Sequence, residues 1–192
     1  MAETAIQVDS VTKLYDGRAV LDAIKLDVIH GETLVILGGS GSGKSTLLRL
    51  MIGNVIPDSG DVIAFGKGLC SMQPAELDDY RKSVGVLFQS GALYNSMSVA
   101  DNVALPLREH TDLPEETIQI MVKIKLEQVD LREHADKMPA QLSGGMKKRA
   151  GLARAIARAR PARFFIPPES CAGILSACSR RSTCSSLILT MI

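Results

Sequence analysis

The sequence has no tryptophan, and aromatic residues make up only 4% of its 192 residues. So few rings argue against a surface that stacks nucleic-acid bases. An excess of one charge is also missing, because 22 lysines and arginines are balanced by 21 aspartates and glutamates. No segment reaches the roughly 18 apolar residues of a membrane-spanning helix, and no leader pattern occupies residues 1–9. We therefore expect a soluble, cytoplasmic chain that does not bind nucleic acid.

The cysteine spacing of zinc sites is absent as well. Cys70 stands alone, and Cys171, Cys178 and Cys184 are not separated by the two residues typical of zinc ligands. Free, reduced thiols are expected. Aliphatic residues, in contrast, are abundant, and hydrophobic residues make up 46% of the chain. This composition and length favour one α/β domain with a sizeable core.

Periodicity predicts a mixed order of strands and helices. Alternating segments joined by Asp16-Gly17 predict an antiparallel pair, and a short aliphatic run before a glycine-rich loop predicts a buried strand. We expect the helix from Ser98 to break at Pro106 and to restart near Pro114. The predicted strands are 6–14, 20–29, 33–37, 61–65 and 84–88, and the predicted helices are 47–52, 74–82, 98–137 with that break, and 146–160.

The strongest motif is the loop between the third strand and the first helix. It reads Gly38-Gly39-Ser40-Gly41-Ser42-Gly43-Lys44-Ser45 and satisfies G-x-x-x-x-G-K-[ST]. Its glycines let backbone N–H groups surround a phosphate, and the helix adds its positive end. In this arrangement Lys44 contacts the β- and γ-phosphates, and the Ser45 hydroxyl binds Mg²⁺. The structural alternative, a flexible turn, does not account for the complete motif between a strand and a helix.

A second glycine-rich motif, Leu142-Ser143-Gly144-Gly145-Met146, opens the last predicted helix. A helix start with a serine and free N–H groups suits phosphate oxygens. The same residues also suit an ordinary serine cap followed by glycines for close packing.

The phosphate loop, Gln89 and the LSGG motif occur in the sequence order of the ABC ATPases, and residues 6–160 resemble that family. The segments 87–93 and 106–111 resemble the ATPases of Mla-type, or MCE-associated, phospholipid transporters. The resemblance implies a P-loop α/β fold with antiparallel N-terminal strands, a parallel core sheet and a helical subdomain inserted at about 95–145. It also implies an ATP-binding subunit on the inner face of the bacterial inner membrane, paired with a membrane permease. ATPases of sugar, amino-acid or metal importers remain an alternative.

The resemblance assigns roles to further residues. Two subunits form a head-to-tail dimer, so that Ser143, Gly144 and Gly145 of one contact the γ-phosphate held by Lys44 of the other. Gln89 contacts Mg²⁺ or the attacking water, or it is a polar residue that ends a buried strand. Thr46 contacts the nucleotide. Tyr15 stacks on adenine, or it is an ordinary aromatic at a strand end.

The tail departs from the family pattern. The resemblance implies Asp-Glu-Pro after an aliphatic strand, whereas this chain reads Phe164-Phe165-Ile166-Pro167-Pro168-Glu169. The magnesium aspartate is missing, Glu169 is expected to be a solvated loop residue, and His30, His110 and His134 all precede the place of the switch histidine. We expect an incomplete ATPase domain over 1–163 and an atypical tail over 164–192. One hypothesis is that a shifted reading frame replaced the C-terminal part and then stopped early, and the other is a divergent or degenerate subunit. A hydrolysis-deficient nucleotide-binding fragment is therefore a second hypothesis.

One basic stretch runs through the last predicted helix and includes Lys147, Arg154 and Arg158. It can contact nucleic acid or anionic lipid headgroups, or it can be a solvated helix face. We expect the solvated face, because no aromatics lie between the basic residues. A non-transport ABC protein that acts on nucleic acid lacks support in so short a chain.

Overall fold

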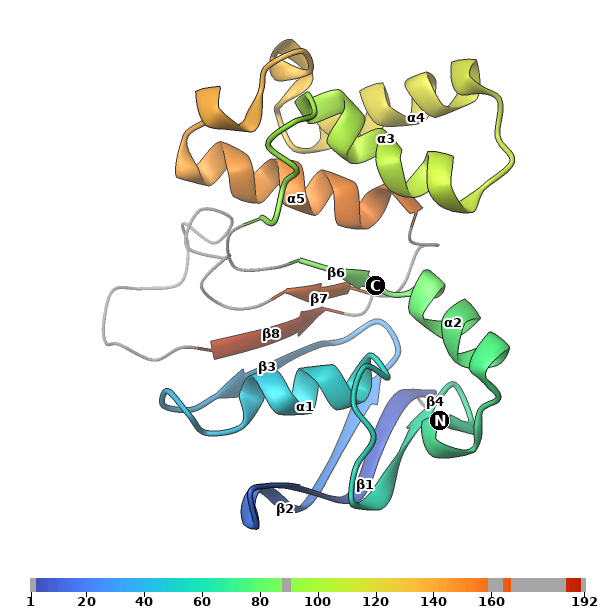
Figure 1. The fold of residues 1–192 in the computed structure, drawn as a ribbon, viewed down its shortest axis with the longest axis vertical. Helices are drawn as coiled ribbons and strands as arrows, with labels where there is room; N and C mark the ends of the chain where they lie inside the picture. The colour runs from blue at the N-terminus through green and yellow to red at the C-terminus, as the bar shows by residue number, and fades with distance from the viewer. Residues whose placement is uncertain (1–2, 88–90, 159–163, 167–185, 191–192) are drawn as a thin grey trace. The chain divides into compact units, whose positions relative to one another are not determined.

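The computed structural model describes residues 3–87, 91–158, 164–166 and 186–190. The chain divides into two compact units, and Figure 1 shows the elements of each. Residues 1–84 and 182–192 form the first unit, and residues 85–181 form the second.

The first unit contains a four-stranded antiparallel sheet in the order β2-β1-β4-β5. Asp16 and Gly17 connect β1 to β2 with φ angles of 51° and 75°. Two left-handed residues match the twist of a two-residue hairpin, so the expected antiparallel pair is confirmed. The strands are β1 (Thr4–Tyr15), β2 (Arg18–Ile29), β4 (Ser59–Ala64) and β5 (Lys67–Gly68).

The predicted strand, loop and helix follow in the same unit. Strand β3 (Thr33–Leu37) leads into the loop at 38–43, and helix α1 (Lys44–Met51) begins directly after it. Leu47, Leu50 and Met51 of α1 are buried, so one face of the helix belongs to the apolar core. This packing fixes the direction in which the helix start points.

The expected burial of β3 is wrong, because Val35 is 46% exposed and Leu37 is 65% exposed. Among the described strands β3 pairs only with β8, so it lies at the end of its strand order. The exposed residues of β3 alternate along the strand and so share one face, which the described residues leave uncovered. An aliphatic run alone does not distinguish a strand with one open face from a strand that is buried on both faces.

Helix α2 (Pro74–Ser83) holds the far end of α1. The Tyr80 hydroxyl donates to the Met51 carbonyl at 2.6 Å, and Arg81 Nη2 donates to the Gly53 carbonyl at 2.6 Å. Carbonyl groups at a helix end have no partner within the helix, and these two side chains supply partners.

The described residues of the second unit include three α-helices: α3 (Val99–His110), α4 (Glu115–Gln128) and α5 (Gly144–Arg158). They share one apolar cluster, in which Val103, Ile118 and Ala153 represent the three helices. Single 3-10 turns lie at Arg132–His134 and Pro139–Gln141, and a third, in the first unit, at Leu69–Ser71.

The expected break at Pro106 is wrong, because α3 continues through this residue to His110. Proline removes the N–H that would bond to the Asn102 carbonyl, and this loss normally disfavours the helix. Val103, Ala104 and Leu107 are almost completely buried on either side of the proline. Their burial holds both halves of α3 on the core, so that tertiary packing outweighs the local preference.

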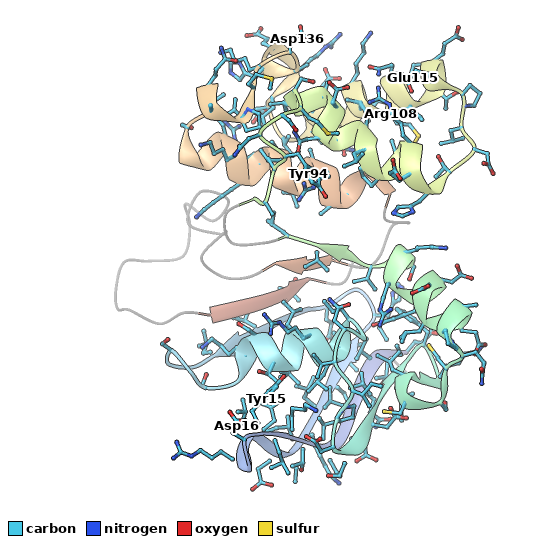
Figure 2. All side chains as sticks on the ribbon, in the orientation of Figure 1. Tyr15, Asp16, Tyr94, Arg108, Glu115 and Asp136 are labelled. Atoms are coloured by element: carbon cyan, nitrogen blue, oxygen red, sulfur yellow. The ribbon has the colours of Figure 1, made fainter. Side chains whose placement is uncertain are left out.

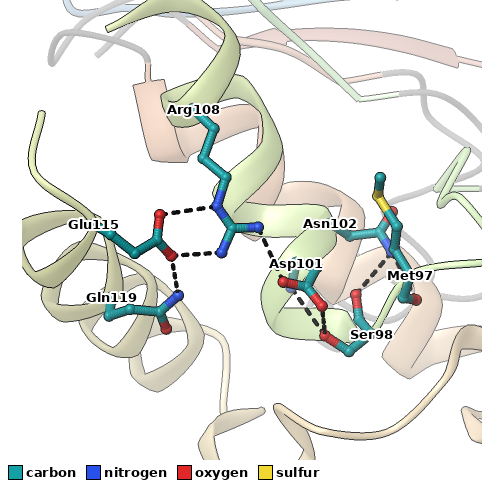
Figure 3. Close-up of polar contacts among 7 residues, drawn as sticks. All are labelled: Met97, Ser98, Asp101, Asn102, Arg108, Glu115 and Gln119. Carbon is teal, nitrogen blue, oxygen red and sulfur yellow. Dashed lines mark hydrogen bonds and ion pairs between the residues drawn. The ribbon is translucent and has the colours of Figure 1, made fainter. Parts of the chain in front are cut away.

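Figure 3 shows the polar network that joins α3 to α4. Arg108 donates from Nε to Glu115 Oε2 at 3.1 Å and from Nη1 to Asp101 Oδ1 at 3.0 Å, and Nη2 contacts Glu115 Oε1. Gln119 Nε2 also donates to Glu115, and Ser98 Oγ donates to Asp101. The hydrogen bonds to Glu115, first those from Arg108 and then the one from Gln119, lower its pKa to about 2.

Three short strands complete the described residues. Strand β6 (Gly85–Val86) pairs in parallel with β7 (Phe164–Ile166), as expected for a core sheet. Strand β8 (Ser186–Thr190) pairs antiparallel with β3, and no strand periodicity predicted it. None of the described helices is long and apolar enough to cross a membrane.

Candidate nucleotide-binding site

The phosphate loop closes around the ammonium group of Lys44. Lys44 Nζ donates to the carbonyl oxygens of Gly38 at 2.7 Å and Gly39 at 2.6 Å, and to Ser42 Oγ at 3.1 Å. The side chain of the motif lysine therefore turns back into its own loop. This places a positive charge at the position where the motif requires one.

Helix α1 begins without a side-chain cap. Gly43 occupies the cap position with φ of 85°, and the first helical bond runs from the Leu47 N–H to the Gly43 carbonyl. The N–H groups of Lys44, Ser45 and Thr46 precede that bond, so the helix itself leaves them without acceptors. A Cβ atom on Gly43 would lie 2.7 Å from the Val20 carbonyl oxygen, which makes glycine necessary at this position.

The residues present suit the phosphates of ATP. The first turn of α1 contains no acidic residue that would repel an anion. Gly39, Ser40, Gly41 and Ser42 are exposed, and Ser45 is an exposed residue at the helix start. Lysine, backbone N–H groups and a hydroxyl are together the donor set that binds phosphate oxygens and Mg²⁺.

Tyr15 lies at the end of β1, where 41% of the residue is exposed, and Figure 2 labels it beside Asp16. Lys13 Nζ lies 5.7 Å from the centroid of its ring. The β1–β2 hairpin also reaches the phosphate loop, because Val20 of β2 contacts the backbone at Gly43. The hairpin that carries Tyr15 is thus next to the loop, with its ring accessible to a planar group.

The LSGG residues lie in the second unit, at the start of α5. Ser143 Oγ accepts a hydrogen bond from the Met146 N–H at 3.3 Å, and the Ser143 carbonyl accepts from Lys147 at 2.9 Å. Ser143 is therefore a helix cap, as the structural interpretation expected. The close packing of the two glycines that this interpretation included is wrong. Ser143, Gly144 and Gly145 are all exposed, and among the described residues no atom outside the local helix backbone lies within 4 Å of a Cβ built on either glycine. This helix start is open on its outer side.

Gln89 and Glu169 lie outside the described residues, so their predicted roles remain predictions. The segment that follows Gln89 is described from Gly91 onward. Asn102, which is completely buried, accepts from the Tyr94 N–H at 2.7 Å and donates to the carbonyls of Tyr94, Met97 and Ser98. Sequence reasoning missed Asn102, because no local pattern distinguishes a buried asparagine from an exposed one.

The basic residues of α5 are not a simple solvated face. Arg149 Nη1 donates to the Val129 carbonyl at 2.9 Å, and Arg154 donates to the carbonyls of Gly91 and Ala92. Both residues are partly buried. The expectation of a solvated face is therefore wrong for Arg149 and Arg154, since their guanidinium groups bind backbone within the same unit.

Two smaller observations concern cysteine and metal sites. Cys70 is a free, exposed thiol as expected, and burial raises its pKa to about 11. Across the described residues, no group of three or more His, Cys, Asp or Glu side chains is placed to hold a metal ion.

An aliphatic strand, a glycine-rich loop with an inward lysine and an uncapped helix start define a phosphate-loop nucleotide-binding domain. The comparison with known families agrees with this class. The family described as ABC transporter matches residues 21–164 of this chain. The chain belongs to the ABC transporter family.

Two relatives share the name intermembrane phospholipid transport system ATP-binding protein MlaF. The protein from Haemophilus influenzae is 46% identical over 157 residues, which cover 82% of this chain and 60% of the relative. The protein from Escherichia coli K12 is 50% identical over 141 residues, which cover 73% of this chain and 52% of the relative. The chain thus spans a little over half the length of these relatives.

A solved structure supports the same fold. The dimeric ATP-binding cassette MJ0796, in a post-hydrolysis state bound to ADP and Pi, has a TM-score of 0.72 and 30% identity. The match covers 80% of this chain and 69% of that chain. The fold is therefore that of an ABC ATPase cassette.

Proposed function

We propose that the chain is the ATP-binding subunit of an ABC transporter that drives phospholipid transport between bacterial membranes. The main support for ATP binding is that the Lys44 ammonium lies inside the loop, beside the free N–H groups at the start of α1. The sequence identity of 46–50% to two ATP-binding proteins of intermembrane phospholipid transport systems supports phospholipid as the transported substrate.

In this proposal the residues from Gly38 to Lys44 hold the phosphates, and Lys44 exchanges its loop carbonyls for phosphate oxygens. Ser45 and Gln89 hold Mg²⁺, Thr46 adds a contact at the helix start, and Tyr15 stacks on adenine. When bound, ATP supplies the phosphoanhydride bond whose hydrolysis drives transport. The protein contributes position and positive charge, which are the main requirements of phosphoryl transfer.

The open start of α5 suggests the second half of the site. Ser143, Gly144 and Gly145 are exposed, and a Cβ on either glycine would meet no atom of another described segment within 4 Å, so a partner subunit can bring a phosphate to them. We infer a head-to-tail dimer of two ATPase subunits, bound to a membrane permease on the inner face of the bacterial inner membrane. Residues 1–163 would form the ATPase domain, with its helical subdomain at about 95–145 and an atypical tail at 164–192.

A nucleotide-binding chain without hydrolysis is the second candidate. The sequence after Ile166 reads Pro167-Pro168-Glu169 in place of the Asp-Glu-Pro that the family resemblance implies, so the magnesium aspartate is missing and Glu169 is not at the position of the family's glutamate. Mg²⁺ and water would then lack the carboxylates that hydrolysis needs.

A fluorescent ATP analogue and a phosphate-release assay test both candidates on the full chain. Binding by the native chain, with weak binding by Lys44→Ala, supports the nucleotide site. Turnover above that of Lys44→Ala supports the ATPase, and binding without turnover supports the second candidate. Capture by the permease of a phospholipid transporter, and not by that of a sugar importer, supports the cargo. Equal binding by the native chain and Lys44→Ala would refute the site.

A further inference from the structure

The segment that begins two residues after Gln89 has an unusual backbone. Gly91 has φ of 74°, and Ala92 has φ of 45°. Glycine adopts this region readily, whereas a residue with a Cβ atom, such as Ala92, adopts it uncommonly and at a cost in free energy. Contacts within the second unit can offset this cost at Ala92.

Arg154 of α5 makes the contacts that do so. Its Nη1 donates to the Ala92 carbonyl at 2.7 Å, and its Nη2 donates to the Gly91 carbonyl at 3.1 Å. Its guanidinium carbon lies 5.8 Å from the centroid of the Tyr94 ring. The two parallel donors of arginine suit two successive carbonyls, an arrangement that the single ammonium of lysine does not reproduce.

The electrostatic setting of Arg154 is unfavourable for a purely stabilising role. None of the ion pairs found among the described residues includes Arg154. Desolvation by burial lowers the pKa of its guanidinium. A partly buried cation that is held by carbonyls and a ring, without a carboxylate, has a desolvation cost that no ion pair offsets. What its hydrogen bonds provide is a fixed position of the backbone that they contact.

Close backbone packing fixes the same segment to α5. A Cβ atom on Gly151 would lie 2.8 Å from the Gly91 Cα atom, and one on Gly91 would lie 2.6 Å from the Lys147 carbonyl oxygen. At the other end of the segment, Asn102 holds Tyr94 by both its N–H and its carbonyl. The residues from Gly91 to Tyr94 are thus anchored at both ends.

We propose that Arg154 is a positioning residue that fixes the backbone of Gly91 and Ala92 to α5, so that the segment after Gln89 moves with the helix that Ser143 caps. A phosphate contact at the start of α5 is then transmitted to Tyr94 through one rigid body. The role in nucleotide response rests on the proposed function, whereas the fixing of the backbone does not.

The absence of tryptophan gives a clean reporter, because Tyr94→Trp introduces the only indole in the chain. Arg154→Gln removes the two donors, and Arg154→Lys keeps the charge and the stem if the first variant folds poorly. Arg149→Gln is the matched control, since Arg149 lies on the same helix and donates to the Val129 carbonyl instead. Each variant is compared by melting temperature, hydrogen–deuterium exchange and binding of a fluorescent ATP analogue.

Without nucleotide, the amides of residues 91–97 should exchange hydrogen for deuterium about tenfold faster in Arg154→Gln than in the native chain, because hydrogen bonds from a charged donor are lost. Arg149→Gln should leave these amides unchanged. With Mg·ATP, the indole emission of the Tyr94→Trp reporter should respond when it stands alone or together with Arg149→Gln. The response should be lost when the reporter is combined with Arg154→Gln and weakened when it is combined with Arg154→Lys.

Unchanged exchange at residues 91–97 in Arg154→Gln would overturn the proposal, and so would a uniform acceleration over the whole unit with a lower melting temperature. A full indole response in the double variant Tyr94→Trp with Arg154→Gln would overturn the transmission. If the native chain does not bind the ATP analogue, the proposed function fails, while the nucleotide-free exchange still decides the role of Arg154.

Discussion

The two glycine-rich helix starts differ in what already occupies them. At α1, Gly43 caps the helix without a side chain, is buried against Val20, and is followed by the inward Lys44. At α5, the Ser143 hydroxyl already accepts the Met146 N–H, and the two glycines after it face open space. The first start has a positive charge and free donors, and the second has an exposed backbone surface.

This difference suggests that the two helix starts have different roles: α1 binds the phosphate, and α5 completes the site of a partner subunit. An uncapped helix start with an inward lysine can bind a phosphate by itself, whereas a start that is capped and open needs a ligand presented by another surface. The substitutions below test this contrast, and the largest effect is expected at α1.

Lys44→Ala should weaken binding of Mg·ATP by about 10- to 100-fold, because a charge-assisted hydrogen bond to phosphate is lost. A fluorescent nucleotide titration measures the loss. The melting temperature should change little, since Lys44 bonds only to exposed loop groups and to Gly38. An equal fall in binding for Lys147→Ala, on the other helix start, would remove the contrast.

Gly43→Ala should lower the free energy of unfolding by about 1–3 kcal/mol, because alanine would be forced into a left-handed backbone and against the Val20 carbonyl. Gly145→Ala is the matched control at α5, where no atom lies within 4 Å. Alanine there should leave stability unchanged or raise it by roughly 0.5–1 kcal/mol. Urea denaturation measures both values, and destabilisation by Gly145→Ala would contradict the open start of α5.

Ser143→Ala should destabilise the chain by about 1 kcal/mol, since the Met146 N–H loses its acceptor. Ser143→Asp should keep stability, because aspartate is also a good cap. Urea denaturation of both variants measures the cap, and equal stability of all three chains would show that the cap does not contribute.

The smallest effect is expected from acid at the network between α3 and α4. The pKa of Glu115 is lowered from 4.5 to about 2 by hydrogen bonds from Arg108 and Gln119. A carboxyl group whose pKa is lowered by folding stabilises the folded chain fully at pH values above its ordinary pKa. This contribution should therefore be lost as the pH falls from about 4.5 through 2. The difference in free energy of unfolding between the native chain and Glu115→Gln should therefore become smaller as the pH falls over this range. A constant difference from about pH 5 to about pH 2 would count against the pairing.

The parts predicted from sequence are those whose signals are local. The turn at Asp16-Gly17, the strand and helix around the phosphate loop, and helix α2 depend on residues that are neighbours in the chain. The course of α3 through Pro106 depends instead on burial against α4 and α5, which no local pattern reveals.

The same limit explains what was missed near Gln89. Arg154 lies more than sixty residues after the carbonyls that it binds, and Asn102 becomes informative only when its partners are known. A basic residue on a helix is usually solvated, and only the fold shows that this one is turned inward.

The hydroxyl of Tyr80 and the guanidinium of Arg81 give α1 a mechanical property. They grip the carbonyls at and just beyond its last turn, while the loop lies at its first turn. Eight residues of α-helix measure about 12 Å, so α1 is a short strut with one end tethered. A force on Lys44 is therefore passed along α1 to α2 through these two hydrogen bonds.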